Sequence, residues 1–180
     1  MPSPATVTVG VMGSGSEELD HLATPLGHLL ARLGVNLLTG AGGGVMTSVS
    51  RAFTTSPRTR GICIGIVPCA SIDDRARAKD GYPNPFVELP IFTHLPYSGT
   101  RGQDDLSRNH INVLSSDAIV ALPGGSGTAS EVVLAVKYGK PIVVFTSGEA
   151  LVSNFDPSVS RVLDIADVEA FLRLRAPLPP

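Results

Sequence analysis

The sequence predicts an α/β fold in which an open, mostly parallel sheet carries helices on both faces. Short apolar runs alternate with stretches whose apolar residues recur at helical spacing. Two glycine clusters each lie where such a run ends and a helical pattern begins. This alternation of strand and helix is typical of α/β domains, and the 180 residues suffice for one domain with its own core.

The periodicities place the elements as follows. Strands are expected at residues 6–12, 35–39, 62–67, 86–92, 118–121 and 140–145. Helices are expected at about 17–33, from 45 to at least 53, and at 104–116, 131–138 and 166–174. Pro90 makes 86–92 an edge strand or a bent one. Residues 1–175 are expected to form one domain, and the proline-rich end, 176–180, a disordered tail.

The composition limits the classes of partner. Hydrophobic residues make up 43% and charged residues 17%, so a second copy of the chain is expected to cover part of the surface, giving a homodimer or larger homo-oligomer. A net charge of −2 argues against nucleic acid as a partner. The sequence shows neither a signal-peptide pattern nor an apolar run long enough to span a membrane, so a cytoplasmic protein without a membrane partner is expected.

The most informative stretch is the glycine-rich turn at 122–131. It follows the apolar run 118–121 and leads into a helix, so its N–H groups and the positive end of the helix dipole favour an anion there. Glu131 lies three residues after Thr128, on the same helix face. We therefore expect a phosphate site with one carboxylate beside it. Its expected binding residues are Gly124, Gly125, Ser126, Gly127 and Thr128.

Two further turns are candidates for the same pocket. Gly42, Gly43 and Gly44 follow the second strand, and Gly13 and Ser14 follow the first. The carboxyl ends of parallel strands converge on one crevice, where ligands of open sheets bind. The alternative is that these glycines only allow helices to pack closely on strands. The first turn lacks the third glycine and the acidic residue of the dinucleotide fingerprint.

The helix expected at 104–116 carries an ambiguous arginine. At about 100° per residue, Leu106, His110, Val113 and Leu114 share one face, whereas Arg108, Asn112 and Ser115 lie opposite. The wheel by itself predicts a packed His110 and a solvated Arg108.

The stretch from Pro123 to Glu131 resembles the PGGxGTxxE signature of the LOG (Lonely Guy) family, whose members are often mislabelled lysine decarboxylases. The likeness extends from the first strand to the strand at 140–145. It implies a Rossmann-like fold, a homodimer or larger assembly, and a nucleotide pocket. Active members of the family hydrolyse the N-glycosidic bond of nucleoside 5′-monophosphates to a free base and ribose 5-phosphate. Arg108 and Glu131 match their catalytic arginine and glutamate.

Chemistry and departures from the signature leave alternatives open. Cleavage of a ribosyl bond develops positive charge on the sugar, which Glu131 can stabilise, while Arg108 can bind phosphate, sugar hydroxyls or the departing base. Ser126 and Ser130 differ from the residues found in many hydrolases. The Arg108-Asn109 pair and the segment 129–132 resemble the branch of molybdenum cofactor carrier proteins, which bind a phosphorylated pterin. The sequence favours a phosphoribohydrolase, with a non-catalytic carrier for a phosphorylated ligand or a regulatory nucleotide sensor as alternatives.

Lysine decarboxylation, metal binding and a resident cofactor are not expected. The three lysines, Lys79, Lys137 and Lys140, lie in no context that suits pyridoxal phosphate, so lysine decarboxylation is not predicted. No cluster with metal-ligand spacing occurs, and Cys63 and Cys69 are expected to be buried thiols. We expect neither a metal nor a resident cofactor.

Overall fold

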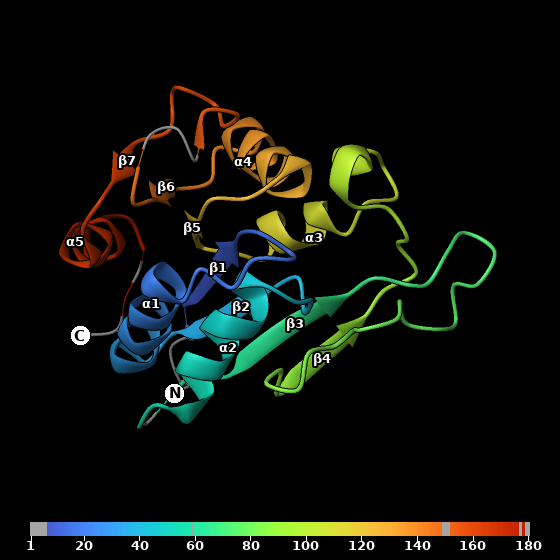
Figure 1. Ribbon diagram of the computed structural model, residues 1–180, viewed down its shortest axis with the longest axis horizontal. Coiled ribbons are helices and arrows are strands. Elements are labelled where there is room, and N and C mark those ends of the chain that lie inside the picture. The colour runs from blue at the N-terminus through green and yellow to red at the C-terminus, as the bar shows by residue number, and fades with distance from the viewer. Residues whose placement is uncertain (1–6, 59, 149–151, 177, 179–180) are drawn as a thin grey trace, which may run out of the picture.

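A parallel sheet forms the centre of the molecule. The computed structural model describes residues 7–58, 60–148, 152–176 and 178. Within them, seven strands lie in the order β4-β3-β2-β1-β5-β6-β7, and every pairing of neighbours is parallel. Figure 1 shows this sheet running across the molecule between two layers of helices. The predicted open, mostly parallel sheet with helices on both faces is confirmed.

The described elements follow the expected alternation. The strands are β1 (Thr8–Met12), β2 (Asn36–Thr39), β3 (Cys63–Val67), β4 (Leu89–Phe92), β5 (Ala118–Ala121), β6 (Ile142–Phe145) and β7 (Arg161–Val162). The helices are α1 (Asp20–Leu33), α2 (Val45–Thr55), the short 3-10 turn η1 (Gly99–Arg101), α3 (Asn109–Leu114), α4 (Ser126–Lys137) and α5 (Ile165–Arg175). Residue 6 of the first predicted strand lies outside the described residues.

The two helical layers bury alternate residues of the strands. Helices α1, α2 and α5 cover one face, and α3 and α4 cover the other (Figure 1). Val11 and Val120 point into the larger core under α1, α2 and α5, whereas Met12 and Ile119 pack against α3 and α4. All four side chains are at most 2% exposed. Successive strand residues point to opposite faces, so both faces are apolar, as expected of a parallel sheet covered on both sides.

Three sequence predictions of boundaries were wrong. The helix expected at 104–116 is the short α3, preceded by turns. The helix expected at 131–138 begins five residues earlier, at Ser126, so the last glycine of the motif lies inside its first turn. The strand expected at 86–92 is confined to Leu89–Phe92, at the sheet edge that Pro90 predicted. β7 was not predicted because two residues are too few for a periodicity.

The polar face assigned to the third helix was also wrong. Arg108 and Asn112 are 5% and 0% exposed, whereas Leu114 is 51% exposed. The helix turns its polar side toward α4, where the Asn109 and Asn112 amides donate to the Ser130 hydroxyl and the Glu131 carboxylate, and a periodicity alone cannot show such partners.

Two smaller observations complete the fold. No helix among the described residues is long and apolar enough to cross a membrane. In the segment expected to be a tail, Ala176 is buried and Leu178 packs against the same core, while residues 177, 179 and 180 lie outside the described part of the chain.

Helices α1 and α2 cross at Gly27. A Cβ atom at this position would lie 2.7 Å from both the Ala52 Cβ and the Val49 carbonyl oxygen. We predict that Gly27→Ala lowers the free energy of unfolding by about 1–3 kcal/mol, although alanine favours helix by about 1 kcal/mol, because overpacking at a rigid backbone contact outweighs propensity. Urea titration measures the change. His28→Ala, at the exposed neighbouring position, is the control and should have little effect; an unchanged Gly27→Ala protein would contradict this packing.

Candidate functional site

A pocket of about 290 Å³ opens where the strand order reverses. From β1 the chain adds β2, β3 and β4 on one side, and then β5, β6 and β7 on the other. The crossovers therefore leave β1 and β5 in opposite directions, and their carboxyl ends are not covered by a helix between them. The volume is near the lower end of small-molecule sites, about 300–1,000 Å³.

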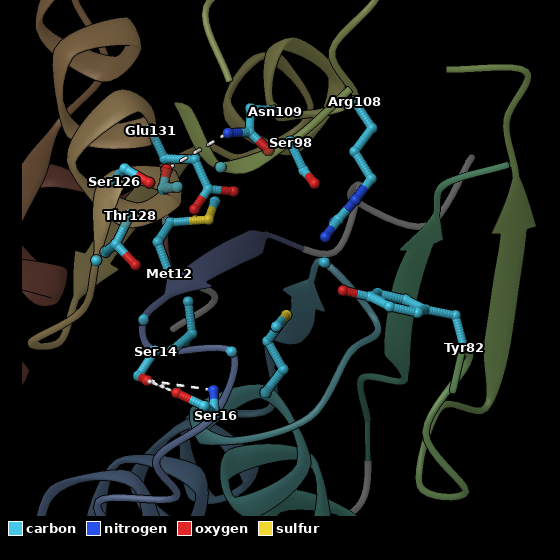
Figure 2. A pocket seen from close by; sticks show the side chains of 18 residues that line it. Met12, Ser14, Ser16, Tyr82, Ser98, Arg108, Asn109, Ser126, Thr128 and Glu131 are labelled. Atoms are coloured by element: carbon cyan, nitrogen blue, oxygen red, sulfur yellow. Dashed lines mark hydrogen bonds between the residues drawn. The ribbon is translucent and has the colours of Figure 1, made fainter. Parts of the chain in front are cut away.

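The pocket draws its walls from segments far apart in the sequence. They are the end of β1 with the turn after it, the end of β2, the long loop before β4, the segment around η1, the start of α3 and the first turns of α4 (Figure 2). The lining residues are Val11, Met12, Gly13, Ser14, Gly15, Ser16, Gly40, Met46, Tyr82, Ser98, Gly99, Arg108, Asn109, Gly125, Ser126, Gly127, Thr128 and Glu131.

The first turn of α4 presents backbone donors to this pocket. Gly125 is the N-cap in an extended conformation, and no side chain caps the helix. The helical bonding begins with the Ala129 N–H, which donates to the Gly125 carbonyl at 3.0 Å. The N–H groups of the preceding turn have no carbonyl four residues back within the helix. These donors and the positive end of the helix dipole make the turn an anion site.

Hydrogen bonds of Ser14 join the turn after β1 to the neighbouring segments of the pocket. The Ser14 hydroxyl accepts the N–H groups of Ser16 at 3.3 Å and Glu17 at 3.0 Å. The Ser14 N–H donates to the Pro123 carbonyl, and its carbonyl accepts the Val45 N–H. Ser14 thereby connects β1, the start of α2 and the turn before α4.

Arg108 reaches into the pocket from the residue before α3 (Figure 2). Its Nη1 donates to the Ile66 carbonyl at 3.2 Å, and its Cζ lies 5.5 Å from the centroid of the Tyr82 ring. Gly40 allows this placement, because a Cβ there would lie 2.1 Å from Nη1. The buried Nε has no hydrogen-bond partner among the described residues.

Glu131 lies on the second turn of α4 with only 8% of its surface exposed. The Asn112 amide donates to its Oε1 at 2.7 Å. Burial raises the pKa of Glu131 to about 7, and this rise outweighs the lowering by the Arg108 charge and the Asn112 hydrogen bond. At neutral pH the carboxyl group is therefore poised between its two protonation states.

Asn109 and Ser130 support the α4 turn from behind. The Asn109 amide donates to the Ser130 hydroxyl at 3.0 Å and to the Gly127 carbonyl at 3.4 Å, and the Ser130 hydroxyl donates to the same carbonyl at 2.7 Å. Ser130 therefore fixes the backbone that carries the donors, and does not itself line the pocket.

The structure brings together some of the candidate residues and leaves others aside. Those that line the pocket are Gly13, Ser14, Arg108, Gly125, Ser126, Gly127, Thr128 and Glu131. Those that do not are Gly124, Gly42, Gly43 and Gly44. The last of these has a φ of 60°, and a Cβ on it would lie 2.4 Å from the Ser14 carbonyl oxygen. Gly44 therefore lets the turn after β2 pack closely against the turn after β1.

The sequence did not point to Tyr82 or Asn109 as pocket residues. Tyr82 lies in the loop between β3 and β4, and only its place after the carboxyl end of β3 could have indicated it. Ser98 and Gly99, beside the short turn η1, also line the pocket. His110 bonds to the Tyr138 hydroxyl at 2.8 Å and is absent from the lining.

Metal ligands do not gather at this pocket. The described residues contain no group of three or more histidine, cysteine, aspartate or glutamate side chains placed to hold a metal ion. Both cysteines are buried, and burial raises the pKa of Cys63 to about 11, so this thiol is not a ready nucleophile.

The family follows from the match to known sequences. Residues 6–172 match the SLOG cluster 4 family, which covers nearly the whole described fold. The chain belongs to this family. The resemblance to LOG-like proteins that the glycine motif suggested is thereby confirmed at the level of the family.

Relatives of this SLOG protein include two of known structure. The molybdenum cofactor binding protein of Rippkaea orientalis is 30% identical, with a TM-score of 0.69 over 96% of this chain and 98% of the other. The molybdenum cofactor carrier protein of Chlamydomonas reinhardtii is 31% identical, with a TM-score of 0.66 over 94% and 99%. An uncharacterised protein of Archaeoglobus fulgidus is 33% identical over 136 residues, 74% of this chain and 76% of the relative.

The raised pKa of Glu131 should make the folding stability of this SLOG protein depend on pH. In the unfolded chain the group titrates near its ordinary value of 4.5, so the folded state binds the proton more tightly between about 4.5 and 7. Stability is then greatest below this window and falls as pH rises through it, by roughly 3 kcal/mol. We predict that Glu131→Gln abolishes this part of the pH dependence. Urea unfolding at pH 4.5, 6 and 8 measures it; parallel curves for the two proteins would contradict the shift.

Proposed function

We propose that this chain is a binding protein for a phosphorylated small molecule, whose phosphate rests on the first turn of α4. The observation that supports this most directly is the pocket itself: backbone donors of α4 and the buried, incompletely paired guanidinium of Arg108 face the same space. The backbone donors suit the phosphate, and the guanidinium is a donor for a hydrogen-bond acceptor elsewhere on the same ligand.

The finer proposal is that the ligand is molybdenum cofactor, a phosphorylated pterin, and that the protein carries it without changing it. Support comes from two relatives of at least 30% identity, aligned over almost their whole length, that bind or carry this cofactor.

A single substitution tests the phosphate position. Gly125 lines the pocket, and a Cβ built on it meets nothing within 4 Å, so valine can be accommodated while it fills the ligand's space. We predict that Gly125→Val lowers ligand affinity at least a hundredfold without loss of thermal stability. Gly148→Val is the matched control, because its Cβ is equally unhindered and lies outside the pocket.

The carrier proposal is tested by measuring how much molybdenum cofactor the protein retains. The protein is mixed with molybdenum cofactor released from a molybdoenzyme, separated by gel filtration, and analysed for bound molybdenum. About one molybdenum per chain is expected for the native protein and Gly148→Val, and almost none for Gly125→Val. Equal retention by all three proteins would place the ligand elsewhere.

The second candidate is hydrolysis of nucleoside 5′-monophosphates. A carboxyl group with a pKa of about 7 in a ligand pocket favours it, because proton transfer is most efficient near the working pH. Water would add to the ribose C1′ while the N-glycosidic bond breaks, and the base would leave with the bonding electrons and take up a proton. Glu131 would orient this water or stabilise the positive charge on the sugar.

Chromatography of AMP and isopentenyl-AMP incubations distinguishes the two candidates. Binding without release of base supports the carrier. Release that falls at least a hundredfold in Glu131→Gln would support hydrolysis instead, a loss in the range for a general acid or base. Release unaffected by this substitution would contradict the role given to Glu131.

We also propose that the chain is a homodimer, joined through α3 and α4. Leu114, Val133 and Val136 are 51%, 37% and 40% exposed on these two neighbouring helices, and large apolar side chains grouped on a surface are typical of interfaces. We predict that Val136→Lys weakens dimerisation at least tenfold in sedimentation experiments. Leu174→Lys, on α5 at 77% exposure, is the control; dissociation by the control alone would indicate another interface.

A further inference from the structure

The guanidinium of Arg108 is held on three sides. The Ile66 carbonyl accepts from Nη1 at 3.2 Å, the Tyr82 ring lies 5.5 Å from Cζ, and the backbone of Gly40 leaves room for Nη1 only because it has no Cβ. The residue is 5% exposed, so few other orientations are open to it. Figure 2 shows Tyr82 and Arg108 meeting at the side of the pocket opposite Ser126 and Thr128.

In this arrangement some N–H groups of the Arg108 guanidinium have no acceptor. A guanidinium has five N–H groups, and the Nε of Arg108 is buried without a partner among the described residues. A buried donor without an acceptor is costly, about 1–3 kcal/mol and more for a charged group. The Nη2 of Arg108 also has no hydrogen-bond partner among the described residues, and unlike Nε it is not enclosed, so an acceptor on a ligand in the pocket can reach it.

The charge of Glu131 indicates which kind of acceptor suits Arg108. Glu131 lines the same pocket, and its pKa responds to the Arg108 charge. If the ligand carried a second anionic group at Arg108, besides the phosphate on α4, the ionised Glu131 carboxylate would repel it. A neutral lactam edge, which carries a carbonyl oxygen beside an N–H, matches both groups: the carbonyl accepts from Arg108 and the N–H donates to Glu131.

We propose that Arg108 and Glu131 form a second ligand subsite that recognises the lactam edge of a heterocyclic ring, with Tyr82 and Gly40 as positioning residues for Arg108. The inference rests on the proposed function, since the same ligand places its phosphate on α4. Pterins and 6-oxopurines both carry such an edge, whereas adenine has an amino group in place of the carbonyl.

IMP and AMP are the probes, because they share the ribose phosphate and differ in this edge. In calorimetric titrations at pH 8, where Glu131 is mostly ionised, IMP should bind at least tenfold more tightly than AMP. A site built to pair with a polar group discriminates strongly against a ligand that lacks it. The Arg108→Met variant should bind IMP and AMP with about equal affinity.

Substitutions around the guanidinium test its positioning. Tyr82→Phe keeps the ring and should keep the preference for IMP, whereas Tyr82→Leu and Gly40→Ala should reduce it at least fivefold. Displacing the guanidinium removes a charge that lowers the pKa of Glu131, so in these two variants that pKa should rise above about 7. Unfolding at several pH values detects this rise, which loss of packing alone would not produce.

The outcomes separate this inference from the proposed function. Equal binding of IMP and AMP by the native protein would overturn the lactam subsite and leave the phosphate site standing. Failure of both nucleotides to bind would contradict the phosphate site and this inference together. A preference for IMP that persists in Arg108→Met would show that another group reads the ring.

Discussion

The reversal of strand order between β1 and β5 is the constraint on which the site depends. Helices that connect parallel strands must cover one face or the other, and at the reversal neighbouring strands send their connections to opposite faces. The carboxyl ends at this point remain uncovered by either connection. The turns that follow β1, β2 and β5 therefore surround a common space, which the pocket occupies.

Within that space, burial decides the electrostatics. Arg108 and Glu131 are both more than nine-tenths buried, and water screens charges poorly at such depth. The Arg108 charge and the Asn112 hydrogen bond lower the pKa of the carboxyl group, but desolvation raises it further. The pocket thus contains a permanent cation beside an acid whose charge depends on pH near neutrality. A site of this kind suits a ligand with an anionic end and a neutral polar edge.

The sequence was most informative where a motif has a local cause. The apolar runs located the central strands, and the glycine-rich turn indicated that a helix follows β5, because these features depend on residues adjacent in the chain. Glu131 became a candidate through its spacing after Thr128 and Arg108 through resemblance, and both line the pocket. The helical wheel placed Arg108 in solvent, because it could not include Tyr82 and Ile66, which come from other segments.

By itself the sequence determined the alternation of strand and helix, the open parallel sheet and the glycine turn that begins α4. Local periodicity and turn chemistry are sufficient for these features. The tertiary structure alone decided that Gly40 makes room for a guanidinium, that Gly44 lets two turns pack closely, and that burial brings the pKa of Glu131 close to neutrality. Each of these depends on the distance between groups far apart in the chain, and no local pattern of residues records that distance.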